Sequence, residues 1–133
     1  MNEVALDASV VLKWFRSHDE PDASPAEEIR SRILDGTLTP LAPGLLWLEI
    51  LNVASRKWNW DEKQLASLAK HLPGMGFRIE EPTLGAIARW CAAGLTAYDA
   101  SYVAVAENAG VNLVTADREI VRLAGGIATP LVH

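Results

Sequence analysis

Four acidic residues of this chain lie where a carboxylate could do chemistry. Asp7 follows the apolar run VAL at 4–6 and Asp117 follows NLVTA at 112–116, so each stands where a buried strand should end. Glu49 lies within the apolar segment GLLWLEILNVASRKW, and Asp99 precedes a run that is apolar nearly all round. Carboxylates crowded in a buried cleft repel by about 4 kcal/mol per pair at roughly 4 Å and an effective dielectric near 20. Such a group, if the fold gathers it, indicates a bound cation.

Each acid also has an ordinary structural explanation. Asp7 and Asp117 suit helix N-caps, where an Asp contributes about 1 kcal/mol, and Thr96 with Asp99 fits a capping box. Glu49 shares a helical face with polar residues, which is typical of a solvent-exposed face. The sequence around each acid, considered alone, does not distinguish a structural role such as helix capping from a role as a cation ligand.

The donor types favour a hard cation. An all-oxygen carboxylate site suits Mg²⁺ or Mn²⁺. The three histidines and the lone Cys91 lack the spacing of zinc ligands, and no serine or cysteine has a histidine close by in sequence to form a nucleophile pair. We therefore expect Mg²⁺ or Mn²⁺ as the cofactor.

The elements that position these acids alternate between strand and helix. We expect strands at 3–7, 39–43, 77–81 and 112–116, with a further strand in the tail. We expect helices at 8–15, from the Ser24–Pro25 cap to Gly36, at 44–57, from Asp61 to about Pro73, and at 83–93, 96–110 and 117–124. Strands joined by helical crossovers predict one domain over residues 1–133, a three-layer α/β/α fold with a short, mostly parallel sheet.

This topology groups two of the acids. In a parallel sheet the carboxyl ends of all strands meet at one edge, where ligands bind, so Asp7 and Asp117 should lie there together. Asp99 begins a helix that returns across the sheet to the strand before Asp117, so we expect it at the opposite edge unless that helix is long and tilted. The residues alone therefore predict a pair, not a cluster of four.

Composition narrows the class of protein. The formal net charge of −5 argues mildly against a nucleic-acid partner, unless several acids are gathered at a metal site and the basic residues lie elsewhere. A single cysteine excludes an internal disulfide framework and fits a reducing compartment. The apolar stretches are broken by proline, glycine or acid, so none should span a membrane. We expect a cytoplasmic protein.

The motifs in their order resemble those of the PIN-domain ribonucleases, and among them the VapC toxins of toxin–antitoxin pairs. These motifs are DAS at 7–9, EILN at 49–52, YDASY at 98–102 and TAD at 115–117, and the resemblance covers essentially the whole chain. It implies a PIN-like domain that cleaves RNA internally with Mg²⁺ or Mn²⁺. It also implies a homodimer that is inhibited by a VapB-like antitoxin, a peptide of which covers the active-site groove.

The resemblance assigns roles to individual residues. It implies that Asp7, Glu49, Asp99 and Asp117 are catalytic and hold metal directly or through water, and that the Asp99 helix starts at the shared edge. Thr115 matches a hydroxyl that supports the last acid, and Ser9 and Asn52 match polar positions in the same pocket. Glu119 stands where many relatives carry a second aspartate, and we do not count it as a ligand.

RNA needs basic residues at the rim of an acidic site. Arg118 is the best candidate because it adjoins Asp117, and Lys13 and Arg16 at the end of the first helix are weaker ones. Each has a solvated-face alternative. Trp58 and Trp60 flank a polar turn and could form a partner surface or close the core, and the 14–15 segment is a weak candidate for the antitoxin groove.

Other functions remain open on the sequence. The chain could be a PIN nuclease of RNA processing without an antitoxin, or an RNA-binding PIN module that has lost catalysis. A phosphoacceptor receiver domain needs a second acid after the first strand and a late lysine. Ser9 follows Asp7 in place of that acid, and no lysine follows Lys70.

Overall fold

The computed structural model describes residues 2–16 and 23–132, and its centre is a sheet of five parallel strands. The strands lie in the order β3-β2-β1-β4-β5. Their bounds are β1 (Asn2–Leu6), β2 (Leu38–Ala42), β3 (Arg78–Ile79), β4 (Leu113–Thr115) and β5 (Ala128–Pro130). The predicted parallel sheet is confirmed, although β3 is shorter than the expected 77–81 because it is an edge strand whose two residues are both exposed.

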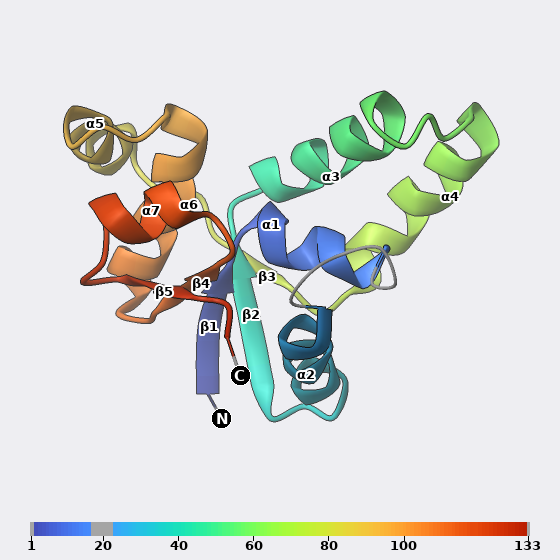
Figure 1. Ribbon diagram of the computed structural model, residues 1–133, viewed down its shortest axis with the longest axis horizontal. Helices are drawn as coiled ribbons and strands as arrows, with labels where there is room; N and C mark the ends of the chain where they lie inside the picture. The colour runs from blue at the N-terminus through green and yellow to red at the C-terminus, as the bar shows by residue number, and fades with distance from the viewer. Residues whose placement is uncertain (1, 17–22, 133) are drawn as a thin grey trace.

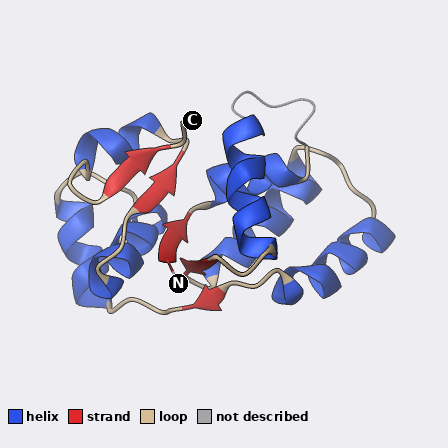
Figure 2. Cartoon of the chain, turned by 90° about the horizontal axis from the view of Figure 1, so that it is seen from below, coloured by secondary structure: helices blue, strands red, loops and turns tan. Residues whose placement is uncertain are grey.

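Helices cover both faces of this sheet (Figures 1 and 2), which confirms the three-layer prediction. One group holds α5, α6 and α7, and the other holds α1 to α4. Their bounds are α1 (Ala8–Val11), α2 (Ala23–Leu34), α3 (Leu45–Arg56), α4 (Glu62–His71), α5 (Leu84–Ala92), α6 (Ala97–Ala109) and α7 (Arg118–Leu123), with the 3₁₀ turns η1 (Leu12–Trp14) and η3 (Leu72–Gly74). The expected helix 8–15 is thus a short α-helix continued by a 3₁₀ turn, and the expected cap Ser24 already lies inside α2.

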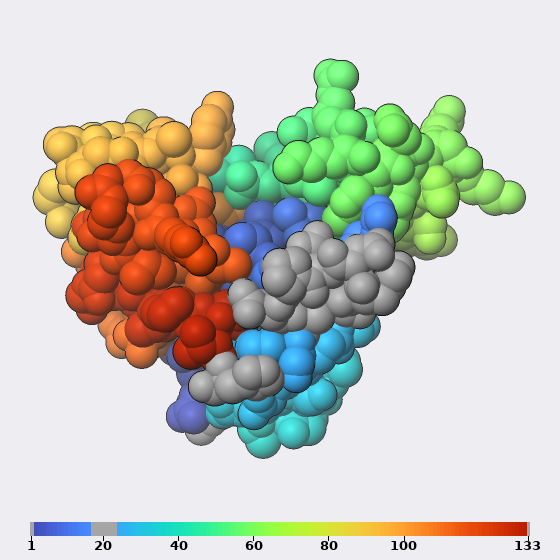
Figure 3. Space-filling model, viewed as in Figure 1, coloured from blue at the N-terminus to red at the C-terminus, as the bar shows by residue number. Residues whose placement is uncertain are grey.

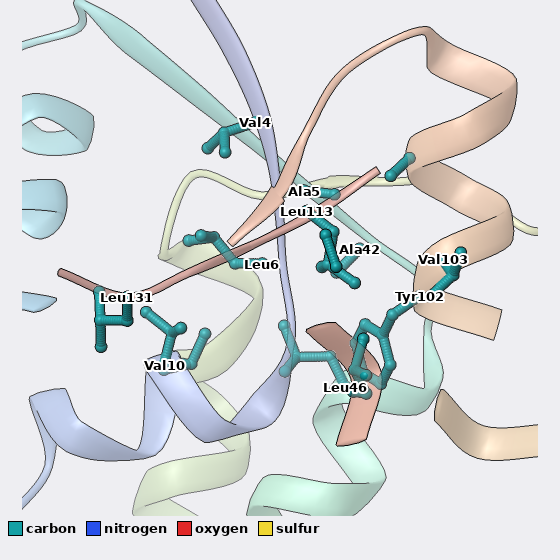
Figure 4. Packing of buried hydrophobic residues seen from close by; sticks show 14 of the residues in the cluster. Val4, Ala5, Leu6, Val10, Ala42, Leu46, Tyr102, Val103, Leu113 and Leu131 are labelled. Atoms are coloured by element: carbon teal, nitrogen blue, oxygen red, sulfur yellow. The ribbon is translucent and has the colours of Figure 1, made fainter. Parts of the chain in front are cut away.

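The core lies between β1 and the helices packed on it (Figure 4). Ala5 and Leu6 of the central strand are fully buried, as is most of α6 from Ala100 to Ala106. The sequence predicted this burial of α6, because its residues are apolar on every side. The Trp14 indole N–H donates to the Ala26 carbonyl at 2.8 Å, which ties η1 to α2. Buried strand ends and a buried helix therefore hold the residues next to the acids rigidly.

The strand order creates a crevice at one edge of the sheet. From β1 the chain passes to β2 and β3 on one side, then returns through α5 and α6 to β4 on the other side of β1. Segments that leave β1 and β4 at their carboxyl ends consequently diverge, and ligands bind at such switch points in open α/β sheets. Asp7 follows β1 and Asp117 lies just beyond β4, so both lie at this point.

Candidate active site

A cavity of about 260 Å³ lies at the switch point and is lined by all four acids. It opens near the hollow that Figure 3 shows between the α5–α7 lobe and the α3–α4 lobe, with α1 at its base. The acids come from four different places in the fold: the end of β1, the middle of α3, the first turn of α6 and the start of α7. The remaining lining residues are Ala8, Ser9, Leu12, Asn52, Val53 and Tyr102.

The position of Asp99 corrects the topology argument drawn from the residues. A crossover helix runs antiparallel to the strands it joins, so α6 ends at Ala109 beside the start of β4 and begins at the opposite, carboxyl edge. That edge is the one that carries Asp7 and Asp117. The family resemblance predicts this edge for Asp99 correctly, whereas the opposite edge expected from the residues alone is wrong.

Asp7 is held by two hydroxyls and does not cap α1. It occupies the N-cap position, but its side chain makes no capping bond. Ser9 Oγ and Thr115 Oγ1 donate to its two carboxylate oxygens at 2.6 Å each. The backbone N–H groups of Ala116 and Asp117 donate in turn to these hydroxyls, at 2.9 and 3.0 Å. Each hydroxyl thus accepts from the backbone after β4 and gives its single proton to Asp7.

This arrangement revises the role of Thr115. The resemblance implied that its hydroxyl supports the last acid, and the hydroxyl does accept the Asp117 backbone N–H. Its own proton, however, goes to the Asp7 carboxylate. Thr115 is fully buried, so it connects the acids of two neighbouring strands from inside the protein.

Burial raises the pKa of Asp7 from 3.8 to about 6. The hydrogen bonds from Ser9 and Thr115 oppose this rise, and the negative charge of Asp117 adds to it. The same causes act on the neighbouring acids: burial first, then the charge of Asp117, raises the pKa of Asp99. The carboxylates therefore destabilise one another's charged forms, and a cation among them would reverse that effect.

Asp117 is both a cap and a lining residue. Its Oδ1 accepts the backbone N–H groups of Glu119 at 2.8 Å and Ile120 at 3.3 Å, which caps α7. Both bonds use one oxygen, so the capping explanation is correct without excluding a second role for the other oxygen. Capping also fixes the direction of the side chain at the cavity wall.

Glu49 is not on an ordinary solvent face. It is half-buried and lines the cavity, and its Oε1 accepts the Tyr102 hydroxyl at 2.5 Å. Burial raises the Glu49 pKa, the hydrogen bond from Tyr102 lowers it, and the charge of Asp99 raises it further. Burial and the bond to Glu49 raise the pKa of the Tyr102 phenol far above its ordinary value, so the phenol stays a proton donor.

Tyr102 is a polar lining residue that the sequence alone does not identify. Its signal was a hydroxyl within an otherwise apolar helix, three residues after Asp99. A buried tyrosine hydroxyl normally finds a polar partner, so its presence there predicted some acceptor nearby. Nothing local in the sequence identifies that acceptor as Glu49 of another helix.

The donor set fits a hard divalent cation in charge and atom type. Four carboxylates offer only oxygen, which suits Mg²⁺ or Mn²⁺. Within residues 2–16 and 23–132, however, no three His, Cys, Asp or Glu side chains are grouped so that they could hold one ion. Mg²⁺ usually binds through one or two carboxylates and keeps several waters. The cavity therefore fits an ion bound partly through water better than a closed protein cage.

The basic residues expected at the rim differ in position. Arg118 is exposed and lines a second cavity of about 260 Å³, which shares Asp117 with the first. It makes no ion pair with the residues that the structure describes. Lys13 is buried, which does not favour a role at the rim, and the Arg16 guanidinium lies over the Trp58 ring, 5.2 Å from its centroid.

Two other expectations concern partner surfaces and the fifth acid. Trp58 and Trp60 are half-buried, packed against the core and 5.3 Å apart between ring centroids, which supports the core-closing alternative. Phe15 does not line the acid cavity; it lines a separate cavity of about 610 Å³ with Trp60 and α4. Glu119 is exposed and ion-paired with Arg122, in keeping with its omission from the ligands.

Comparisons with known proteins agree with this geometry. The family model described as the PIN domain matches residues 4–126. A crystal structure of PAE2754 from Pyrobaculum aerophilum is similar to this chain with a TM-score of 0.67 and 29% sequence identity, over 97% of this chain and 89% of that one. No curated protein matches the sequence. Among the residues described, no helix is long and apolar enough to cross a membrane.

Proposed function

The chain belongs to the PIN domain family, whose members are generally metal-dependent nucleases, and we propose that it is an endoribonuclease that uses Mg²⁺ or Mn²⁺. The observation that carries this proposal is the shared cavity, in which carboxylates from β1, α3, α6 and α7 meet. The residues proposed to act are Asp7, Glu49, Asp99 and Asp117, with Ser9, Asn52 and Thr115 in support.

Asp7, Glu49, Asp99 and Asp117 would hold the cation, directly or through water, and the cation would supply a more acidic water and neutralise charge on the phosphate. Ser9 and Thr115 fix the Asp7 carboxylate by donating to both of its oxygens. The α7 cap does the same for Asp117, through bonds that use Oδ1. We assign the proton of the attacking water to one of the carboxylates, since all four line the cavity in which the cation would lie.

Arg118 places the RNA backbone. Its guanidinium is exposed beside Asp117 and can pair with a phosphate oxygen next to the one being attacked. Arg122, one turn further along α7, is already paired with Glu119. A local cation next to the acids reconciles an RNA substrate with a net charge of −5.

We further propose that the protein is the toxin of a VapBC-type module, a cytoplasmic homodimer held inactive by a VapB-like antitoxin. Apolar side chains of α3 support a protein partner: the exposed Leu48 and the half-buried Leu45 and Leu51 line a cavity of about 700 Å³ that also contains Glu49 and Asn52. A partner on this surface would lie beside the acids. A nuclease of RNA processing without an antitoxin is the alternative, and a neighbouring gene for a small antitoxin separates the two.

The test is cleavage of structured and unstructured RNA with Mn²⁺, Mg²⁺ or chelator by wild type, D7N and D99N. We expect wild type to cleave only with the divalent cation, and both variants to lose at least about a hundredfold in rate, since each removes a charged ligand of the metal. Cleavage that persists in chelator and in both variants would refute the proposal and point to a contaminating nuclease. Intact folding of the variants is checked by circular dichroism.

A further inference from the structure

Tyr102 connects the protein core to the acid cavity. It lies on α6, its residue is only 1% exposed, and its ring belongs to the buried cluster that Figure 4 shows. Its hydroxyl nevertheless reaches the cavity that Asp99, on the same helix, also lines. The ring is therefore an immobile support that presents one polar atom at the cavity wall.

That polar atom donates to Glu49 Oε1 at 2.5 Å. An O–H donor and a carboxylate form charge-assisted bonds at about 2.5 to 2.7 Å, which are roughly twice as strong as neutral ones. Within the part of the chain that the structure describes, this is the single hydrogen bond made by the Glu49 carboxylate, and it leaves Oε2 for another partner. The bond also ties α3 to α6, the helices on the two sides of the cavity.

Glu49 needs such a support more than Asp7 and Asp117 do. Asp7 is fixed by two hydroxyls and Asp117 by two backbone N–H groups. Glu49 has a longer side chain with more rotatable bonds, and it stands in mid-helix, where no free backbone N–H is available to it. Because the rigid, buried Tyr102 ring holds the Glu49 side chain, that side chain loses its conformational entropy on folding and not on cation binding.

We propose that Tyr102 is a positioning residue, whose hydroxyl holds the Glu49 carboxylate in place as a cation ligand of the acid cavity. This inference rests on the proposed function, because it presumes that the cavity binds a divalent cation. Tyr102 itself touches neither the cation nor the substrate; it acts through Glu49. A merely structural hydroxyl would stabilise the fold without changing the affinity for the ion.

The first test is a double-mutant cycle read by Mn²⁺ binding, with free Mn²⁺ measured by electron paramagnetic resonance. We expect Y102F to weaken Mn²⁺ binding about tenfold, as losses of partners behind a metal ligand typically do. In an E49Q background the same change should add little. Y98F removes the hydroxyl of the other tyrosine of α6, which is exposed, and should bind Mn²⁺ like wild type.

The outcomes separate the two proposals. If wild type binds Mn²⁺ and Y102F binds it equally well, or if Y102F weakens binding as much in the E49Q background, this inference is overturned while the proposed function stands. If wild type binds no Mn²⁺, the proposed function fails and takes this inference with it. Unfolding in urea shows whether Y102F is folded under the conditions of the titration.

A second measurement needs no change at Tyr102. The chain has two tyrosines, so the Y98F protein contains Tyr102 alone. Its tyrosine doublet in ultraviolet resonance Raman spectra reports whether the hydroxyl donates a strong hydrogen bond. We expect a strong donor in Y98F and loss of that signature in Y98F/E49A. An identical doublet in the two proteins would overturn the assignment of Glu49 as the acceptor.

Discussion

At the scale of single residues, the site is built by hydrogen bonds that orient the carboxylates of Asp7, Glu49 and Asp117. The Asp7 carboxylate illustrates this, because both of its donors are hydroxyls that are themselves fixed by backbone N–H groups after β4. Two donors that can only give their protons to Asp7 favour its ionised form, whereas burial disfavours it, and burial dominates. The ionised Asp7 carboxylate therefore lowers the stability of the fold, and a bound cation would offset that loss.

This balance predicts how stability depends on pH without metal. The folded pKa of Asp7, about 6, lies above its ordinary 3.8, so neutral Asp7 favours the folded state. That contribution is complete below about pH 3.8 and is lost as the pH rises through about 6. With chelator present, the free energy of unfolding of wild type relative to D7N should therefore fall by about 2 to 3 kcal/mol between about pH 4 and pH 8.

Urea unfolding of the two proteins across this pH range measures the effect. Any change in the free energy of unfolding that the Asn side chain itself causes does not vary with pH. The pH dependence of the difference between wild type and D7N therefore reports the titration of Asp7. Addition of Mn²⁺ at pH 8 should stabilise wild type more than D7N. A difference that stays flat with pH would show that burial does not raise the pKa of Asp7 in the folded protein.

At the scale of elements, the sequence predicted most of the fold and half of the site. Alternating apolar strands and helices with clear caps gave the parallel sheet, and Asp61 does form the capping box of α4 with Gln64. Asp7 and Asp117 were placed at one edge by topology alone. Asp99 was not, because we assigned the wrong direction to α6, and the resemblance supplied its place.

What the sequence did not contain were contacts between distant elements. Nothing local relates Glu49 of α3 to Tyr102 of α6, which are 53 residues apart, or Ser9 to the backbone at Ala116. The local sequence predicts that the Asp7 side chain caps α1, but the structure contains no such capping bond. The carboxylate accepts the hydroxyl of the buried Thr115 instead. Tertiary contacts of this kind decide the site and are not encoded by spacing.

At the scale of the whole molecule, the proposed RNA substrate requires a local cationic patch, because the chain has a net charge of −5. Several arginines are paired with a nearby acid, as Arg89 is with Glu107 and Arg122 is with Glu119, whereas Arg118 stands exposed next to the cavity. We therefore expect R118A to weaken binding of a labelled single-stranded RNA about three- to tenfold, and to reduce the slope of log K against log[salt] by about 0.7.

Fluorescence anisotropy in the cleavage-deficient D99N background, with Mn²⁺ present, measures this without loss of substrate. R122A is the matched control on the same helix, and it should retain the affinity and slope of its parent because its guanidinium is already paired. Equal effects of R118A and R122A would argue that Arg118 contributes only general charge.

The most direct measurement of the central claim compares two aspartates that both cap helices. Asp117 caps α7 inside the cavity, and Asp61 caps α4 outside it. Asn caps about as well as Asp, so D117N and D61N should both stay within about 0.5 kcal/mol of wild type in unfolding free energy. Equilibrium Mn²⁺ binding, followed by electron paramagnetic resonance, should then be at least about tenfold weaker in D117N and unchanged in D61N. Equal Mn²⁺ affinity in D117N, D61N and wild type would contradict the account, because the acids at the sheet edge would then hold no cation.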